Sequence, residues 1–243
     1  MVTPLIIKFT PSMQTGLIIL GVLCIVFLVL AVMAEYPKAA LGFELKTAVG
    51  MLGQTPVLIA ALALLCYIGL ENSMSNWTSR LMNELYTAAG APDPAKSSAT
   101  VLSIFGLSIM VGRFIAAGVK NLTAIGVKVL VAASAVAVVT LIALYLAGSP
   151  MVAIVAVVLT GLAFAPIFPT VLGVTFAKYE PRYYGSIFGI IFAVGLFGGG
   201  FFQNLIGWMA GESVQSGFIV LAIAAALLLV VALIMGRAKK PAV

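Results

Sequence analysis

Histidine is absent from the 243-residue sequence, and cysteine occurs only twice, at Cys24 and Cys66. The lack of histidine excludes a histidine proton relay and any histidine-ligated metal site. Each cysteine falls inside an apolar run and has no partner at redox-motif spacing, so we interpret both as small buried hydrophobes. We therefore expect neither a metal site nor a bound cofactor.

Charged residues are also scarce. They make up 8% of the chain, against about 25% in soluble domains, whereas hydrophobic residues make up 63%. The apolar runs exceed the roughly 18 residues that mark a spanning helix, and they lack the two-residue alternation of an outer-membrane barrel. The sequence therefore predicts an all-α, polytopic membrane protein. It has no phosphate-binding G-x-x-x-x-G-K-[ST] motif and no assembled nucleophile and base, so neither ATP-driven transport nor an enzyme is indicated.

Seven apolar stretches of transmembrane length follow one another with short connections. We predict spanning helices over residues 16–34, 55–81, 97–119, 126–147, 151–177, 185–209 and 216–235.

The basic residues give these spans an orientation. Only Lys8, Arg80 and Lys96 fall on one side, and the other ten of the 13 basic residues fall on the opposite side. Because cytoplasmic loops are enriched in lysine and arginine, we expect a cytoplasmic C-terminus and an external N-terminus in the cell inner (plasma) membrane. The net charge of +6 follows from this topology and requires no nucleic-acid partner.

An internal repeat points to the architecture. "SIFGLSIMVGRF", residues 103–114, returns as "SIFGIIFAVGLF", residues 186–197, with seven identical positions at an offset of 83. The offset contains three spans, so the two copies cross the membrane in opposite directions, as in the inverted repeats of secondary transporters. The alternative is that low-complexity apolar sequence produced the match by chance.

The repeat divides the chain into one helix followed by two helix triplets. Residues 1–54 are interpreted as the end of a preceding half, with one helix and a cytoplasmic connection. Residues 55–243 are interpreted as a six-helix transporter bundle, with repeats at 55–147 and 151–235.

Four stretches carry a resemblance to a known family. They are "YIGLENSMSNW", "MVGRFIAAGVK", "GLAFAPIFPTVLG" and "YYGSIFGIIFAVGLFGGG". Together they resemble the major facilitator superfamily, in particular the C-terminal half of its sugar-type proton symporters, and the seven spans look like helices six to twelve of that family. On that resemblance this chain lacks most of the first five helices of the family, and we expect a partner chain or segment that supplies them; a homodimer, association with membrane-complex subunits and loss of transport are the alternatives.

Glu71 is the most unusual residue of the second span. The unbroken apolar run from Val57 to Leu70 contains 14 residues, or about 21 Å of helix, which is less than the roughly 30 Å hydrocarbon core. Glu71 must therefore lie within the membrane, where an unpaired central charge costs about 2.5 to 3.5 kcal/mol. We expect it to face a cavity, a proton or a solute; the alternative is a structural hydrogen bond to a neighbouring helix.

Polar residues follow Glu71 at helical intervals, and a second helix adds to them. Gln203 and Asn204 lie about as far into the sixth span as Glu71 lies into the second. Trp77 offers a ring surface for a sugar, or else anchors the helix at the membrane interface. The resemblance implies that Glu71 couples proton movement, and the substrate-binding set we predict is Tyr67, Asn72, Ser75, Asn76, Trp77, Gln203 and Asn204.

Gating and packing roles are predicted for a further set. Gly161, Pro166 and Pro169 interrupt the fifth span, which is either a broken helix beside the site or a packing kink, and Gly195 and Gly199 permit close helix contacts. Arg113 stands at a cytoplasmic helix end, where the family uses basic residues to latch helices together. Arg80 is the candidate counter-charge for Glu71, or an interfacial residue.

The leading hypothesis is part of a secondary transporter that moves a small polar solute, with a sugar as one candidate, by proton-coupled alternating access. The alternative is a non-transporting, major-facilitator-like scaffold subunit of a membrane complex. Membrane lipid is a partner under either hypothesis.

Overall fold

The computed structural model describes residues 13–34, 50–51, 53–119, 122–209 and 213–237. The chain divides into two compact units, Met1–Gly42 and Phe43–Val243, which we describe separately. The expected cytoplasmic connection between them falls almost wholly outside the described residues.

The first unit contains α2 (Met13–Met33). Its 21 residues give a length of about 32 Å, enough for the roughly 30 Å hydrocarbon core. The apolar residues are distributed all round its axis, as in a helix that contacts lipid. The predicted span 16–34 is confirmed as a helix, displaced by one to three residues at its ends.

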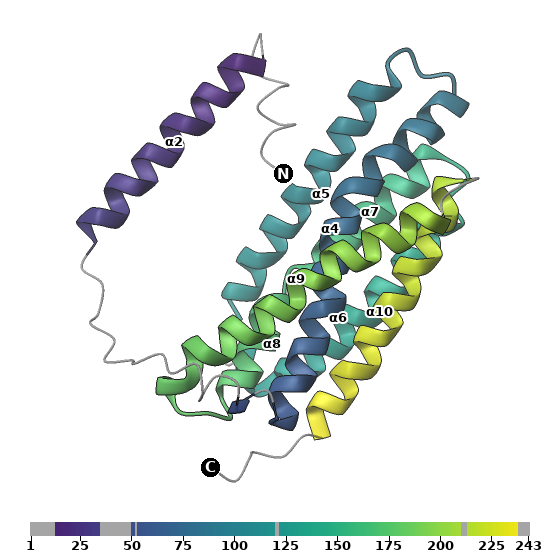
Figure 1. The fold of residues 1–243 in the computed structure, drawn as a ribbon. Helices are drawn as coiled ribbons and strands as arrows, with labels where there is room; N and C mark the ends of the chain where they lie inside the picture. Colours follow the sequence, from purple (N-terminus) through teal and green to yellow (C-terminus); the bar gives the residue numbers. More distant parts are fainter. Residues whose placement is uncertain (1–12, 35–49, 52, 120–121, 210–212, 238–243) are drawn as a thin grey trace. The chain divides into compact units, whose positions relative to one another are not determined.

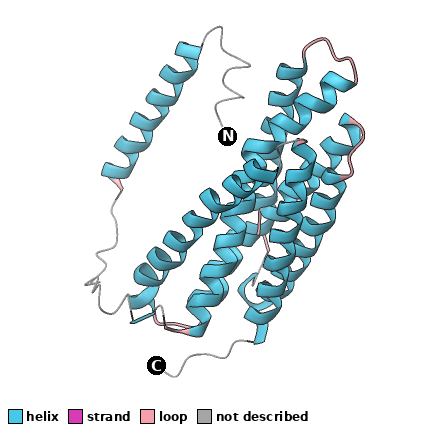
Figure 2. Ribbon diagram, turned by 45° about the vertical axis from the view of Figure 1, so that its right-hand side comes forward, coloured by secondary structure: helices cyan, strands magenta, loops and turns pink. Residues whose placement is uncertain are grey.

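The second unit is a bundle of six membrane-spanning segments (Figure 1). Together with α2, seven helices in the described residues are long and apolar enough to cross a membrane, so the chain is a multi-pass membrane protein. Figure 2 shows that every regular element of the described part is helical. The elements of the bundle are α4 (Thr55–Ala88), α5 (Pro94–Ala117), α6 (Leu122–Tyr145), α7 (Pro150–Phe164), α8 (Ile167–Phe176), the 3₁₀ turn η1 (Pro181–Tyr183), α9 (Tyr184–Met209) and α10 (Val214–Arg237).

The helix α4 is seven residues longer than predicted, because the polar residues after Leu81 remain helical beyond the apolar segment. It ends where Gly90 takes a left-handed conformation, with φ of +69°, which glycine adopts without steric cost. The next helix starts at once: Pro94 occupies its first turn, and the Asp93 side chain accepts a hydrogen bond from the backbone N–H of Lys96 at 3.0 Å.

The fifth span is broken into α7 and α8. Proline has no N–H, so Pro166 and Pro169 cannot donate to the carbonyl groups four residues earlier, those of Leu162 and Ala165. The regular helix accordingly stops at Phe164 and resumes at Ile167. The interruption predicted from these prolines is therefore present; we call residues 164–167 the α7–α8 break.

The contacts between helices show the relation expected of two inverted triplets. In the two triplets α4 corresponds to α7 with α8, α5 to α9, and α6 to α10. The first helix of each triplet contacts the second helix of the other (α4–α9 and α7–α5) and also its third helix (α4–α10, and α7 and α8 with α6). The two third helices, α6 and α10, contact each other. The repeated glycines agree: Gly112 of α5 packs against α7, and Gly195 of α9 packs against α4. The repeated sequence thus occupies equivalent places in the bundle.

The most extensive contact is between α4 and α9, and glycine makes it close. A Cβ at Gly195 would lie 2.6 Å from the Ile68 side chain, and a Cβ at Gly198 would overlap the carbonyl oxygen of Leu65. The two backbones can touch only because these positions carry no side chain.

We expect Gly198→Ala to lower the thermal unfolding temperature by several degrees, because its methyl group would collide with the Leu65 backbone and overpacking costs about 1 to 3 kcal/mol. Gly200→Ala is the matched control, since Gly200 has open space around it and alanine favours a helix. Thermal unfolding in detergent micelles measures both. Equal unfolding temperatures for the two variants would contradict the packing described.

Candidate functional site

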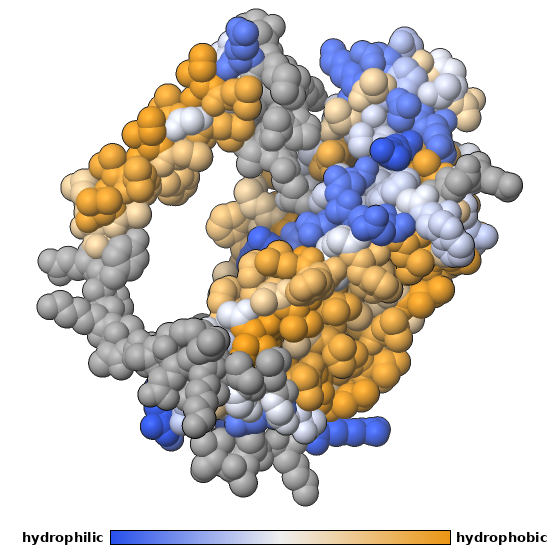
Figure 3. All heavy atoms as spheres, in the orientation of Figure 1, coloured by the Kyte–Doolittle hydropathy of each residue, from blue (hydrophilic) through white to orange (hydrophobic). Residues whose placement is uncertain are grey.

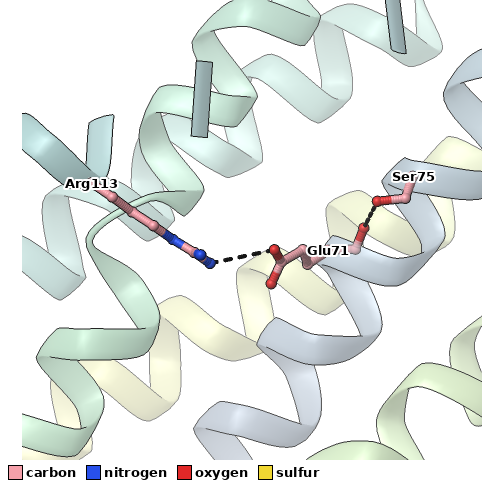
Figure 4. A network of polar contacts seen from close by, with 3 residues as sticks. All are labelled: Glu71, Ser75 and Arg113. Atoms are coloured by element: carbon pink, nitrogen blue, oxygen red, sulfur yellow. Dashed lines mark hydrogen bonds and ion pairs between the residues drawn. The ribbon is translucent and has the colours of Figure 1, made fainter. Parts of the chain in front are cut away.

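The centre of the candidate site is an ion pair between α4 and α5. Arg113 Nη2 lies 3.5 Å from Glu71 Oε1, as Figure 4 shows. The Glu71 side chain is 24% exposed and that of Arg113 is 50% exposed, so one edge of the pair is open. The arginine supplies the positive charge that a carboxylate within a membrane span requires.

In this conformation the partner of Glu71 is Arg113 and not Arg80. The guanidinium of Arg80, the candidate counter-charge for another conformation, lies over the ring of Trp77, 4.8 Å from its centroid. Arg113 was assigned only a latch or topological role at a helix end. In the structure it also reaches into the site from the neighbouring helix.

A third polar group lies beside the pair and beneath the surface. Tyr67, one turn before Glu71, is fully buried. Glu71 and Arg113 are the charged groups that act on its hydroxyl, yet among the described residues the hydroxyl has no hydrogen-bond partner of acceptable geometry. Because Tyr67 is enclosed, a solute on the exposed face of α4 does not reach its side chain in this conformation.

The remaining polar side chains of α4 face outward in part. Ser75 donates its hydroxyl hydrogen to the backbone carbonyl of Glu71 at 2.8 Å, and exposed Asn76 donates to that of Asn72 at 3.1 Å. These bonds fix side chains within one helix and leave amide oxygens exposed. Trp77 is half-buried and packs against the core.

Two α9 residues, Gln203 and Asn204, lie beside these polar side chains of α4. Gly199 lies beside the amide of Asn72, and Gly207 lies near the Trp77 ring, so Gln203, midway between the glycines, is level with the turn after Glu71. Gln203 is half-buried, whereas Asn204 is exposed and donates to the Gly200 carbonyl at 2.8 Å. The structure therefore brings the amides of both helices to one level.

The polar residues form a connected face on α4, α5 and α9. Figure 3 shows hydrophilic residues gathered over the upper part of the six-helix bundle, with apolar surface below them. We call Glu71, Asn72, Asn76, Arg113, Gln203 and Asn204 the polar face.

A separate hollow between α4 and α9, lined by Leu65, Leu196, Phe197 and Phe201 among others, is almost wholly apolar and suits lipid rather than a polar solute.

Of the predicted gating and packing residues, Gly161 and Gly195 lie at close contacts between helices, and Gly199 lies beside the Asn72 amide. Gly161 is buried against α5, where a Cβ would lie 2.8 Å from that of Ser108. Gly112 packs on the α7–α8 break, 2.5 Å from the Ala165 Cβ by the same measure. No cluster of metal-ligating side chains occurs in the part of the chain that the structure describes.

Comparisons with known proteins give a fold but no sequence relative. No family model and no curated protein matches the sequence. The structure matches that of a variant of the E. coli fucose:proton symporter FucP, with a TM-score of 0.69. It also matches FucP, described as a major facilitator superfamily transporter in the outward conformation, with a TM-score of 0.68. The chain has the major facilitator fold.

The two matches cover 91% of this chain and 54% of the FucP chain, at 19% identity. The chain therefore spans about half the length of the structures it matches. The resemblance stated from the four sequence stretches is confirmed for the fold.

Arg113→Gln should destabilise the protein more than the double variant Arg113→Gln/Glu71→Gln does, because the single change leaves a carboxylate uncompensated in the membrane. Thermal unfolding of wild type, both single variants and the double variant at neutral pH gives the coupling energy, which we expect to be about 1 kcal/mol. The exposed pair Arg182–Glu180, 2.8 Å apart, is the control and should show almost no coupling. Additive effects at Glu71 and Arg113 would show that the pair does not interact in solution.

Proposed function

We propose that this chain is part of a secondary active transporter that moves a small polar solute by alternating access. The observation that carries the proposal is the Glu71–Arg113 ion pair, open on one side and set in the polar face of a major facilitator fold. Ionisable residues inside a membrane span are expensive and generally mark a pathway for ions or substrates. One of the matched structures is named as a fucose:proton symporter.

The polar face supports an uncharged, polyhydroxylated solute. Its charges compensate each other, and its remaining groups are the amides of Asn72, Asn76, Gln203 and Asn204, which can donate to and accept from hydroxyl groups. The ring of Trp77, at the same end of α4, is covered on one face by the Arg80 guanidinium in this conformation, so a sugar would stack on that face only after Arg80 has moved. A sugar is therefore the solute class that we propose, and FucP is named for a sugar.

Glu71 is the group we propose for coupling to protons. When it is ionised, it is attracted to Arg113; when it is protonated, that attraction is lost and α4 and α5 are free to change their contact. A carboxylate that gains a proton on one side of the membrane and loses it on the other can tie the two conformations to proton movement. No chemical step on the solute is required.

The polar face needs a second wall. The chain spans 54% of the FucP chain, and we propose that further helices, in a partner chain or segment, cover Asn76 and its neighbours to enclose the solute. Under the scaffold alternative the same face would be sealed permanently by other subunits; no feature of the described residues favours that arrangement.

Glu71→Gln should abolish proton-driven uptake while leaving solute counterflow, because glutamine keeps the shape of the side chain but cannot carry a proton across. Radiolabelled sugars, beginning with fucose, can be assayed in proteoliposomes with and without a pH gradient. Glu84→Gln, which changes an exposed carboxylate further along α4, should behave as wild type. Normal coupled uptake by the Glu71 variant would remove Glu71 from the mechanism.

A cysteine placed at Asn76 should react with a membrane-impermeant maleimide applied from outside, since we propose that this face is water-lined and opens outward. Leu62→Cys is the control on the same helix: its side chain is also exposed, at 50%, but lies in the apolar part of α4, where lipid should shield it. Both changes are made after replacing Cys24 and Cys66 with serine. Absence of labelling at residue 76 would favour the sealed scaffold, and labelling only from the cytoplasmic side would reverse the proposed orientation.

A further inference from the structure

The α7–α8 break lies against both sides of the ion pair. On the Arg113 side, Gly112 packs directly on the break: a Cβ at Gly112 would lie 2.5 Å from the Ala165 Cβ and 3.3 Å from the Leu162 carbonyl oxygen. That oxygen is one of those left without a helical donor by the prolines. The backbone that carries Arg113 therefore touches the weakest point of the span.

On the Glu71 side, the contact is made by the ring of Tyr67. It meets Phe164, the last residue of α7, edge-on with centroids 6.0 Å apart, and Phe168, in the first turn of α8, with centroids 6.2 Å apart. These two phenylalanines flank the break. A displacement of the Tyr67 ring is thus transmitted to both helices at the point where they join.

At the other end of Tyr67, the hydroxyl lies within reach of both Glu71 and Arg113 but forms no well-aligned hydrogen bond with either in this conformation. A buried hydroxyl without a hydrogen bond costs about 1 to 3 kcal/mol, and such a group in a native structure calls for an explanation. Here the explanation lies next to it, because Glu71 and Arg113 are beside the hydroxyl but are engaged with each other. A second arrangement, in which the pair opens, would give the hydroxyl a partner.

We propose that Tyr67 is a positioning residue that couples the charge state of the Glu71–Arg113 pair to the angle between α7 and α8. This inference rests on the proposed function and adds to it the path by which a proton changes the conformation. In the paired state the hydroxyl has no well-aligned hydrogen bond, and the ring contacts Phe164 and Phe168. When Glu71 takes a proton, Arg113 releases it, the carboxyl group bonds the Tyr67 hydroxyl, and the ring moves against the break.

Few other charges can interfere at this point. Of the elements packed against α4, α5 contributes Arg113 and, in its first turn, Lys96, and the described residues of α7 and α8 contain no titratable side chain. Tyr184 and Arg237 stand at the ends of α9 and α10. On α4 itself, Cys66 adjoins Tyr67, Arg80 is more than two turns away over Trp77, and Glu84 and Tyr86 lie further along the helix. A pH response of the break that requires Glu71 therefore reports on this cluster.

The experiment measures the break directly and needs no solute. Spin labels are attached at Leu58 on α4 and at Ala177, which caps α8, in the full chain with both native cysteines replaced by serine. Both sites are exposed. Double electron–electron resonance in nanodiscs at pH 5.5 and pH 8 then gives the label-to-label distances, and with them the populations of the two proposed arrangements of the α7–α8 break. We expect them to interchange with pH in the wild type and to be independent of pH in Glu71→Gln.

Tyr67→Phe is the decisive variant because it keeps the ring contacts with Phe164 and Phe168 and removes only the hydroxyl. We expect the population ratio at pH 5.5 to move about tenfold toward the pH 8 state, the size expected from one lost hydrogen bond to a polar partner. Tyr179→Phe is the matched control, since it also removes a buried hydroxyl without a partner, but away from the pair; it should respond as wild type does.

Three outcomes overturn the inference: no pH response in the wild type, a wild-type response in Tyr67→Phe, or a response that persists in Glu71→Gln. The first and second refute Tyr67 coupling whatever the transport assays give. Conversely, if the labels respond as expected while Glu71→Gln retains proton-driven uptake, the coupling stands and the proposed role of Glu71 in transport fails.

Discussion

The rest of the site depends on one constraint, which is that a carboxylate within a bilayer has to be paired or protonated. Glu71 meets it through Arg113 on the neighbouring helix, at 3.5 Å. The pair is a single contact between two partly exposed side chains. A tighter, fully buried pair would cost more to separate and would suit a permanent structural role. The open geometry is the one that the proposed transport cycle would require of a pair that forms and separates.

Close packing between helices determines where the Glu71–Arg113 pair lies in the bundle. The α4–α9 contact is close because glycines on α9 admit the α4 backbone, and Gly112 on α5 lets the same kind of approach occur at the α7–α8 break. The charged groups are thus held between rigid contacts on one side and an interrupted helix on the other. Such an arrangement confines movement to the place where backbone hydrogen bonds are already missing.

The seven spans could be predicted because hydropathy is a local property, whereas the depth of Glu71 within the membrane stays a prediction. The partner of Glu71 could not be predicted, because the predicted helix ends place Glu71 and Arg113 at different heights along their helices. With the predicted helix ends, Glu71 lies 10 residues before the end of its helix (81 − 71) and Arg113 lies 16 after the start of the next (113 − 97), a mismatch of six residues or about 9 Å. With the observed ends the separations are 17 (88 − 71) and 19 (113 − 94), so the two side chains are nearly level. Tyr67 shares a helical face with Glu71, but its burial depends on Phe164 and Phe168, about a hundred residues away.

At one of the positions where the two copies of the repeated sequence differ, the surroundings differ as well. Arg113 in the first copy corresponds to Leu196 in the second, and Leu196 lines the apolar hollow with Phe197 and Phe201. The same backbone segment, used twice, therefore has two surroundings: a carboxylate at the first copy and apolar side chains at the second. The repeat supplies one helix shape in two copies, while the residue at this position decides which copy holds the charge.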